Sequence, residues 1–193
     1  MRPVLFYIFD LPVYSYSVFA VLAYLAGLGY AWVAAGKEGI DRIHVVDISI
    51  FLFLGGIIGS RLFFVLIEHQ RFLSHPLDVF KIWKGGLVYY GGFIGAVAAG
   101  LIFIRLRKLD CLQWCDLLAP VAMIVLVVGR FGCLLNGCCY GKVAPDLPWG
   151  ITYPASHPVL GLHRYPVHPT PLYESLAALV IFGLLLVIKR RQH

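Results

Sequence analysis

The chain has 193 residues, of which 60% are apolar and 13% are charged, and its mean hydropathy is +0.83. Soluble proteins average about 25% charged residues, so the composition excludes a soluble monomer and indicates one integral membrane domain over residues 1–193. The formal net charge of +6 occurs without a long soluble basic segment, so anionic lipid rather than nucleic acid is the expected partner.

Five apolar stretches are long enough to cross a bilayer as helices, which takes roughly 20 residues. They cover about residues 14–35, 45–67, 86–104, 117–136 and 171–188. The sequence therefore predicts an all-α, polytopic membrane helical bundle. The first stretch is too long for a signal peptide, and no clear small-x-small cleavage motif follows it, so we expect it to remain in the mature protein.

Residues 70–84 are too polar to span a membrane, yet they carry several large apolar side chains. These are Phe72, Leu77, Val79, Phe80, Ile82 and Trp83. A short segment of this kind is typical of a piece that lies in the membrane interface. We therefore expect an interfacial helix between the second and third spans.

Glycines recur in the second span, at 55, 56 and 59, and around the third, at 85, 86, 91, 92 and 95. Small residues at such positions let helices or lipid approach closely. Arg61 follows the first group, and a cation at membrane depth needs a cavity or an anionic partner. Arg61 and Arg130 together suggest a shared anionic guest, for which lipid phosphate is the common candidate.

Basic residues set the expected orientation. Tight clusters occur at 105–108 and 189–191, and both fall on the cytoplasmic side if the N-terminus is outside. The sequence thus predicts an exterior N-terminus, a cytoplasmic C-terminus and an exterior loop after the fourth span.

The end of the fourth span carries the densest chemistry, GRFGCLLNGCCYG at 129–141. Arg130 is a functional-site candidate because a membrane arginine is costly without a partner; snorkelling to the headgroups is the alternative. Cys133 lies one helical turn beyond Arg130 and Cys138 two turns beyond, so both thiols share its face if the helix persists. A thiol beside that cation should have a depressed pKa and could act as a nucleophile.

The cysteines leave other interpretations open. Cys138 and Cys139 could form a redox pair, although adjacent cysteines bridge only with strain. A tetrahedral metal site is conceivable, but neither C-x4-C-C nor the C-x3-C of Cys111 and Cys115 is a standard zinc spacing. We therefore expect no metal and no cofactor, and we expect Cys111 and Cys115 to serve as small apolar packing residues.

The longest loop, about residues 140–170, contains little apolar patterning, and long loops of this kind are usually functional. His168 stands out because the segment PTPLYE follows it directly at the start of the fifth span. Glu174 enters the membrane there, and its carboxylate requires a partner, for which Arg130 or Arg61 is the candidate.

Several short motifs in one collinear order resemble the prolipoprotein diacylglyceryl transferases. GRFGCLLNGCCYG is similar to that family's G-R-x-G-N-F-x-N-G-E-x-x-G. The other matching segments are YSYS at 14–17, GGIIGSRLFFVL at 55–66, WKGGLVYYGG at 83–92, PWG at 148–150, Tyr153-Pro154 and HPTPLYE at 168–174. The resemblance covers nearly the whole chain, and typical members continue into a further span.

The resemblance implies transfer of the diacylglyceryl group of phosphatidylglycerol to the lipobox cysteine thiol of a preprolipoprotein, with release of glycerol phosphate. It implies a bacterial cytoplasmic (inner) membrane location with the site open to the outer leaflet. Arg130 would bind or polarise the phosphate, while Tyr16 and Asn136 would contact lipid. The remaining polar lining would be Arg61, Gly141, His168, Tyr173 and Glu174, with His168 able to act as a base for the thiol.

Four positions depart from the family pattern: Cys133 replaces Asn, Cys138 replaces Glu, Tyr90 replaces His and Val167 replaces Arg. We expect Tyr90 and Cys133 to bind substrate and Cys138 to take a catalytic role in place of the missing polar groups. Three interpretations compete: the transferase, with a lipoprotein thiol or another acceptor; a membrane thiol-disulfide oxidoreductase using Cys138 and Cys139; and a lipid-binding protein without chemistry.

Overall fold

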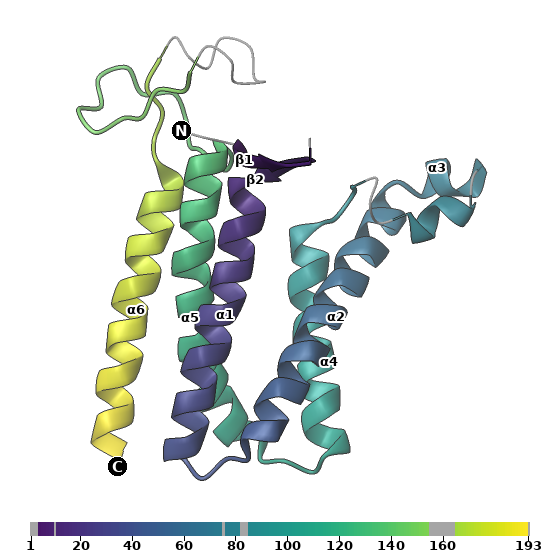
Figure 1. The fold of residues 1–193 in the computed structure, drawn as a ribbon, viewed down its shortest axis with the longest axis vertical. Coiled ribbons are helices and arrows are strands. Elements are labelled where there is room, and N and C mark those ends of the chain that lie inside the picture. The colour runs from purple at the N-terminus through teal and green to yellow at the C-terminus, as the bar shows by residue number, and fades with distance from the viewer. Residues whose placement is uncertain (1–3, 10, 75, 82–84, 155–164, 193) are drawn as a thin grey trace. The chain divides into compact units, whose positions relative to one another are not determined.

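The computed structural model describes residues 4–9, 11–74, 76–81, 85–154 and 165–192 (Figure 1). Within these ranges five helices are long and apolar enough to cross a membrane, which confirms the predicted all-α, multi-pass class. They are α1 (Ser15–Lys37), α2 (Arg42–Ile67), α4 (Tyr89–Leu106), α5 (Cys111–Asn136) and α6 (Thr170–Gln192). Contacts divide the chain into two compact units, residues 1–31 with 117–193, and residues 32–116.

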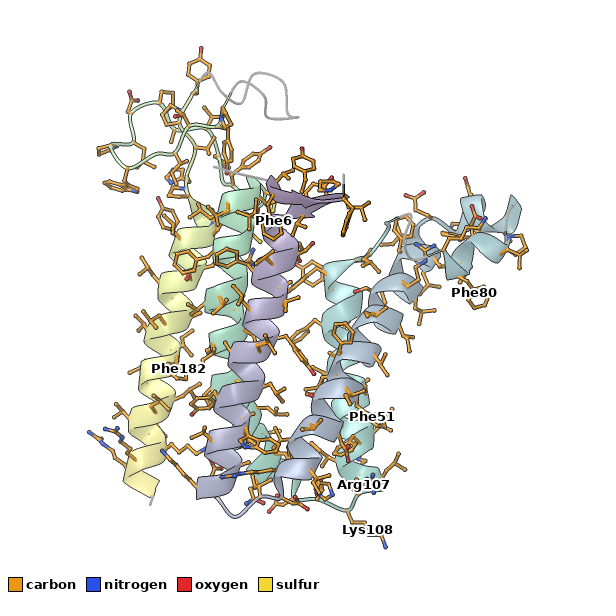
Figure 2. The ribbon with its side chains drawn as sticks, in the orientation of Figure 1. Phe6, Phe51, Phe80, Arg107, Lys108 and Phe182 are labelled. Carbon is orange, nitrogen blue, oxygen red and sulfur yellow. The ribbon has the colours of Figure 1, made fainter. Side chains whose placement is uncertain are left out.

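In the first unit α1, α5 and α6 lie side by side, with α5 running opposite to the other two (Figure 1). Tyr30 of α1 contacts Phe182 of α6 edge to face, with ring centroids 5.6 Å apart; Phe182 is labelled in Figure 2. The hydroxyl of Ser175 on α6 donates to the carbonyl of Val127 on α5 at 3.3 Å. These two contacts tie α6 to both α1 and α5.

A β-hairpin precedes α1, which the sequence analysis did not predict. Strands β1 (Val4–Ile8) and β2 (Leu11–Tyr14) pair antiparallel. Exposed aromatic side chains on the hairpin include Phe6, Tyr7 and Phe9. The hairpin lies at the same end of the first unit as the C-terminus of α5 (Figure 1).

Helix α5, the fourth of the predicted spans, starts earlier than predicted, at Cys111 rather than near Leu117. The carboxylate of Asp110 explains the difference, because it accepts from the amides of Leu112 at 2.9 Å and Gln113 at 3.4 Å and so caps the helix. Pro120 lies inside the helix without ending it. The apolar run therefore predicted the membrane-spanning part, and the cap extends the helix beyond it.

In the second unit α2 packs against α4 through the glycines noted in the sequence. A Cβ atom at Gly59 would lie 2.3 Å from the carbonyl oxygen of Gly91, and one at Gly55 would lie 2.6 Å from that of Gly95. No side chain fits at these backbone contacts, so these glycines serve helix packing rather than lipid approach. Arg107, labelled in Figure 2, follows the end of α4 and pairs with Asp47 near the start of α2 at 3.6 Å.

The described residues between α2 and α4 contain no helix long enough to span a membrane, as predicted. They include α3 (His69–Ser74) and the 3-10 helix η1 (Pro76–Phe80), in which Leu77 and Phe80 have exposed side chains. Phe72 is buried and contacts Phe64 edge to face at 6.0 Å. Ile82 and Trp83 lie outside the described residues, and placement in the membrane interface stays a prediction.

Candidate active site

Arg130 and Glu174 form an ion pair between the last turns of α5 and the first turns of α6, through Nη2 and Oε2. Of the two partners considered for the Glu174 carboxylate, the structure selects Arg130. The Arg130 side chain is 20% exposed. Its Nε is buried and has no hydrogen-bond partner among the described residues. The guanidinium therefore has a donor left for a further acceptor, such as a phosphate oxygen.

The fourth-span helix ends at Asn136, so Cys133 and Cys138 do not share a helical face. Gly137 adopts a left-handed conformation, with φ 77°, and the amides of Gly137 and Cys138 both donate to the carbonyl of Cys133, at 3.0 and 3.1 Å. This is the Schellman-like way of ending a helix, which favours glycine. The turn still brings the thiols together: the sulfur atoms of Cys133, Cys138 and Cys139 lie within 4.8 Å of one another.

The depressed pKa expected for Cys133 and Cys138 beside Arg130 stays a prediction, whereas Cys139, the third thiol of the cluster, has a raised pKa. Burial raises the pKa of the Cys139 thiol, and the neighbouring Cys138 raises it further, while the Arg130 guanidinium lowers it by a smaller amount. The neutral thiol is therefore favoured at Cys139. An additional positive charge near Cys139 would favour its thiolate.

The loop after the cysteines is tied to the start of α6. The amide of Gly141 donates to the carbonyl of His168 at 2.9 Å, and the amide of His168 donates to that of Lys142 at 3.1 Å. The Thr170 hydroxyl donates to the carbonyl of Cys139. A Cβ at Gly141 would lie 2.9 Å from both His168 Cβ and Thr170 Cγ2, which explains a glycine at this position.

His168 belongs to a chain of polar side chains that joins the loop to the start of α6. Its Nδ1 lies 3.3 Å from the Tyr173 hydroxyl, which also accepts a hydrogen bond from Trp149 Nε1 at 2.7 Å. Trp149 was expected only as part of the PWG motif, and its contact with Tyr173 was not predicted. Beneath the loop, Tyr153 is buried, and burial, followed by the effect of Cys138, raises its pKa to about 12.

The start of α1 contributes Tyr16. Its backbone lies against α5, since a Cβ at Gly132 would be 3.6 Å from Tyr16 Cα. Tyr16 is 51% exposed and lies within electrostatic range of the three thiols and of Arg130. The neighbouring Ser15 is fully buried, and its hydroxyl has no hydrogen-bond partner in the described part of the chain. The sequence analysis did not single out Ser15 as a site residue.

Arg61 lies in the second unit and has a different environment from the one predicted. Its Nε donates to the carbonyl of Val79 at 2.8 Å, and the rest of the guanidinium donates to four more carbonyls. These belong to Asp78, Lys81, Gly85 and Gly86. Arginine has five N–H groups, so every donor has a backbone acceptor and none is left for a lipid phosphate. The guanidinium therefore holds residues 78–81 and 85–86 in place, and the substrate-binding role expected of Arg61 stays a prediction.

Tyr90 also lies in the second unit, at the start of α4. Its side chain is exposed and contacts the ring of Tyr89 edge to face, at 5.8 Å between centroids. The structure brings together nine of the predicted site residues around the end of α5 and the start of α6, and their roles stay predictions. They are Tyr16, Arg130, Cys133, Asn136, Cys138, Gly141, His168, Tyr173 and Glu174.

Comparison with known proteins identifies similar chains. The family model described as prolipoprotein diacylglyceryl transferase matches residues 3–193. Curated relatives named phosphatidylglycerol–prolipoprotein diacylglyceryl transferase include one from Geobacter sulfurreducens, 35% identical over 98% of this chain and 72% of its own length. Those from Caulobacter vibrioides and Clostridium tetani are 37% and 30% identical, over 85% and 99% of this chain.

This chain covers between 63% and 75% of the length of those three relatives. The family resemblance drawn from the motifs is confirmed. The names of these relatives match the transferase interpretation, and none of them favours the thiol-disulfide alternative.

Proposed function

The chain belongs to the prolipoprotein diacylglyceryl transferase family, and we propose that it moves the diacylglyceryl group of phosphatidylglycerol to the lipobox cysteine thiol of a preprolipoprotein. The observation that carries this proposal is the Arg130 guanidinium, paired with Glu174 at the end of a membrane helix and retaining a buried, unpartnered Nε among the described residues. An arginine so placed suits the phosphate group of a membrane lipid.

In the proposed reaction the thiol sulfur attacks the glycerol carbon that bears the phosphate ester. A sulfur–carbon bond forms and the carbon–oxygen bond breaks, with the electron pair leaving on glycerol phosphate. The thiol loses one proton. The products are a thioether-linked diacylglyceryl group and glycerol phosphate, so atoms and charge balance without an oxidant.

Arg130 has the task of stabilising the charge on the departing phosphate. A guanidinium donates to two phosphate oxygens at once, and a fixed donor in a water-poor site stabilises developing charge more than it would in water. Removing one such donor in other enzymes costs about 10²–10³ in turnover. Glu174 holds the guanidinium in position through the ion pair.

His168 is the proposed base for the acceptor thiol. Its Nδ1 lies 3.3 Å from the Tyr173 hydroxyl, and that hydroxyl also accepts a hydrogen bond from Trp149 Nε1. The Tyr173 hydroxyl is therefore fixed in position and can orient the His168 ring. Tyr16 and Asn136 are proposed to contact the lipid. A covalent relay through Cys138 is a second route for the same transfer, and a serine at this position tests it.

The arrangement of the first unit supports a site that opens to one face of the membrane. The hairpin, the Arg130 end of α5 and the start of α6 lie at one end, while the basic residues 189–191 lie at the other end of α6 (Figure 1). Basic clusters at helix ends favour the cytoplasmic face. We therefore propose that the site opens to the outer leaflet of the bacterial cytoplasmic membrane.

The test incubates the purified full chain in detergent with labelled phosphatidylglycerol and a lipobox peptide. The expected result is lipid on the peptide and an equal amount of glycerol phosphate released. Arg130→Gln should lower turnover at least about 100-fold, whereas Arg190→Gln, at the far end of α6, should not change it. Glycerol phosphate release without lipidated peptide would point to another acceptor, and no release from the wild-type chain would reject the proposal.

A further inference from the structure

Three free thiols converge where α5 ends. The sulfur atoms of Cys133, Cys138 and Cys139 all lie within 4.8 Å of one another, although 133 and 139 are six positions apart in sequence. Three thiolates bound to one zinc ion at about 2.3 Å lie roughly 4 Å apart if the ion is in their plane. The thiols therefore need only small side-chain adjustments to bind a common ion.

The backbone is shaped to make this cluster. Gly137 and Cys139 both adopt left-handed conformations, with φ 77° and 58°. This conformation is sterically disfavoured for a cysteine, and such strain persists only where surrounding contacts maintain it. The hydrogen bond from Thr170 to the Cys139 carbonyl and the bond from the Cys138 thiol to the Cys133 carbonyl, at 3.7 Å, supply those contacts. The turn thus directs adjacent cysteines to the same place.

The number of thiols distinguishes a metal site from a disulfide. A disulfide would use two of the three sulfur atoms, and the pair Cys138 and Cys139 would close a strained ring. Three convergent thiols match the donor set that selects soft, thiophilic metal ions. The Arg130 side chain, one helical turn before Cys133, contributes a positive charge close enough to lower the pKa of the Cys139 thiol, which favours the thiolate that a metal ion needs.

We propose that Cys133, Cys138 and Cys139 bind one Zn²⁺ ion as three thiolates, leaving the fourth coordination position open. Binding releases three protons, one from each thiol, and changes no oxidation state. The spacing C-x4-C-C gave no reason to expect this site, because only the turn at Gly137 brings the third sulfur to the other two.

The open position fits the incoming thiol, an extension that rests on the proposed function. Zinc sites with three protein ligands reserve the fourth for water or substrate, and a thiol that coordinates zinc is deprotonated outright. The acceptor thiol would bind there, pass its proton to His168 and attack the glycerol carbon as a thiolate. The thioether product is a weaker ligand and leaves the ion.

The binding test uses the reduced full chain in detergent, stripped with a chelator and titrated with Zn²⁺, and with Cd²⁺ as a probe that absorbs when thiolates bind. We expect one ion per chain, measured by elemental mass spectrometry after gel filtration. Cys138→Ser and Cys139→Ser should each weaken binding by at least about 100-fold. Cys115→Ser, a change of the same size at an exposed cysteine outside the cluster, should bind as the wild type does.

Elution volume and helical circular dichroism show whether each variant is folded. The site is rejected if the folded wild type retains no ion. It is also rejected if Cys115→Ser weakens binding as much as Cys138→Ser does, or if two cluster thiols remain a disulfide after reduction.

Metal stoichiometry does not depend on turnover, so the two proposals fail separately. A wild-type chain that binds one ion but transfers no lipid would leave the zinc site standing and reject the proposed function. A stripped chain that transfers lipid as fast as the zinc-loaded chain would reject coordination of the acceptor thiol.

Discussion

Replacing Arg61 with Lys tests the assignment of this side chain to backbone support. Arg61 is 7% exposed and places five N–H groups on five carbonyl oxygens of residues 78–86. Lysine has three donors, so at least two of these partly buried carbonyls lose their partner. At about 1 kcal/mol for each bond, Arg61→Lys should lower the free energy of unfolding by at least about 2 kcal/mol.

For a chain of this length that loss corresponds to a fall in melting temperature of roughly 4–8 °C. Thermal unfolding in detergent measures it, and limited proteolysis should show faster cleavage within residues 78–86. Arg107→Lys is the matched control, because Arg107 is 57% exposed and has one ion pair at 3.6 Å, so the change should stay within about 0.5 kcal/mol. Equal melting temperatures for Arg61→Lys and the wild type would refute the reasoning.

Three further predictions concern packing and titration. Gly59→Ala should destabilise the second unit by about 1–3 kcal/mol, because its Cβ would lie 2.3 Å from the Gly91 carbonyl oxygen. Gly29→Ala is the control, because no atom lies within 4 Å of its Cβ, and it should leave the free energy of unfolding unchanged. Equal melting temperatures for the two variants would contradict this prediction. The raised pKa of Tyr153, about 12 against 10.0, means that its contribution to stability is complete below pH 10 and is lost as the pH rises toward 12, a dependence that Tyr153→Phe should remove in pH-dependent unfolding. The raised pKa of Cys139 predicts that its alkylation by iodoacetamide, followed by peptide mass spectrometry, keeps accelerating above pH 9, and a plateau below that pH counts against burial as the cause.

Local patterns predicted the membrane helices well because spanning is a local requirement. Each helix must present about 20 apolar residues, and four of the five predicted starts lie within three residues of the observed helix starts. The start of α5 was missed by six residues, since a polar cap at Asp110 rather than apolar character determines it. The hairpin at residues 4–14 was missed altogether because short, apolar strands carry little periodicity.

Residue type and position were enough to identify Arg130 as a site candidate, but the environment of Arg61 was not predictable in the same way. Both are arginines near glycines in apolar helices, and desolvation makes either one require acceptors. The acceptors of Arg61 are backbone carbonyls 17 to 25 positions away in the sequence. Backbone acceptors carry no side-chain signal, so no motif could have revealed them.

By itself the amino-acid order determined the membrane class, the spans and the family, since hydrophobic length and short collinear motifs are properties of contiguous residues. The tertiary structure alone decided which polar groups meet. It paired Glu174 with Arg130, enclosed Arg61 in carbonyls and gathered three thiols around a turn. The physical reason is that contacts between polar groups far apart in sequence depend on where the chain turns and on the backbone conformation of each turn. Both are determined only when distant segments pack together.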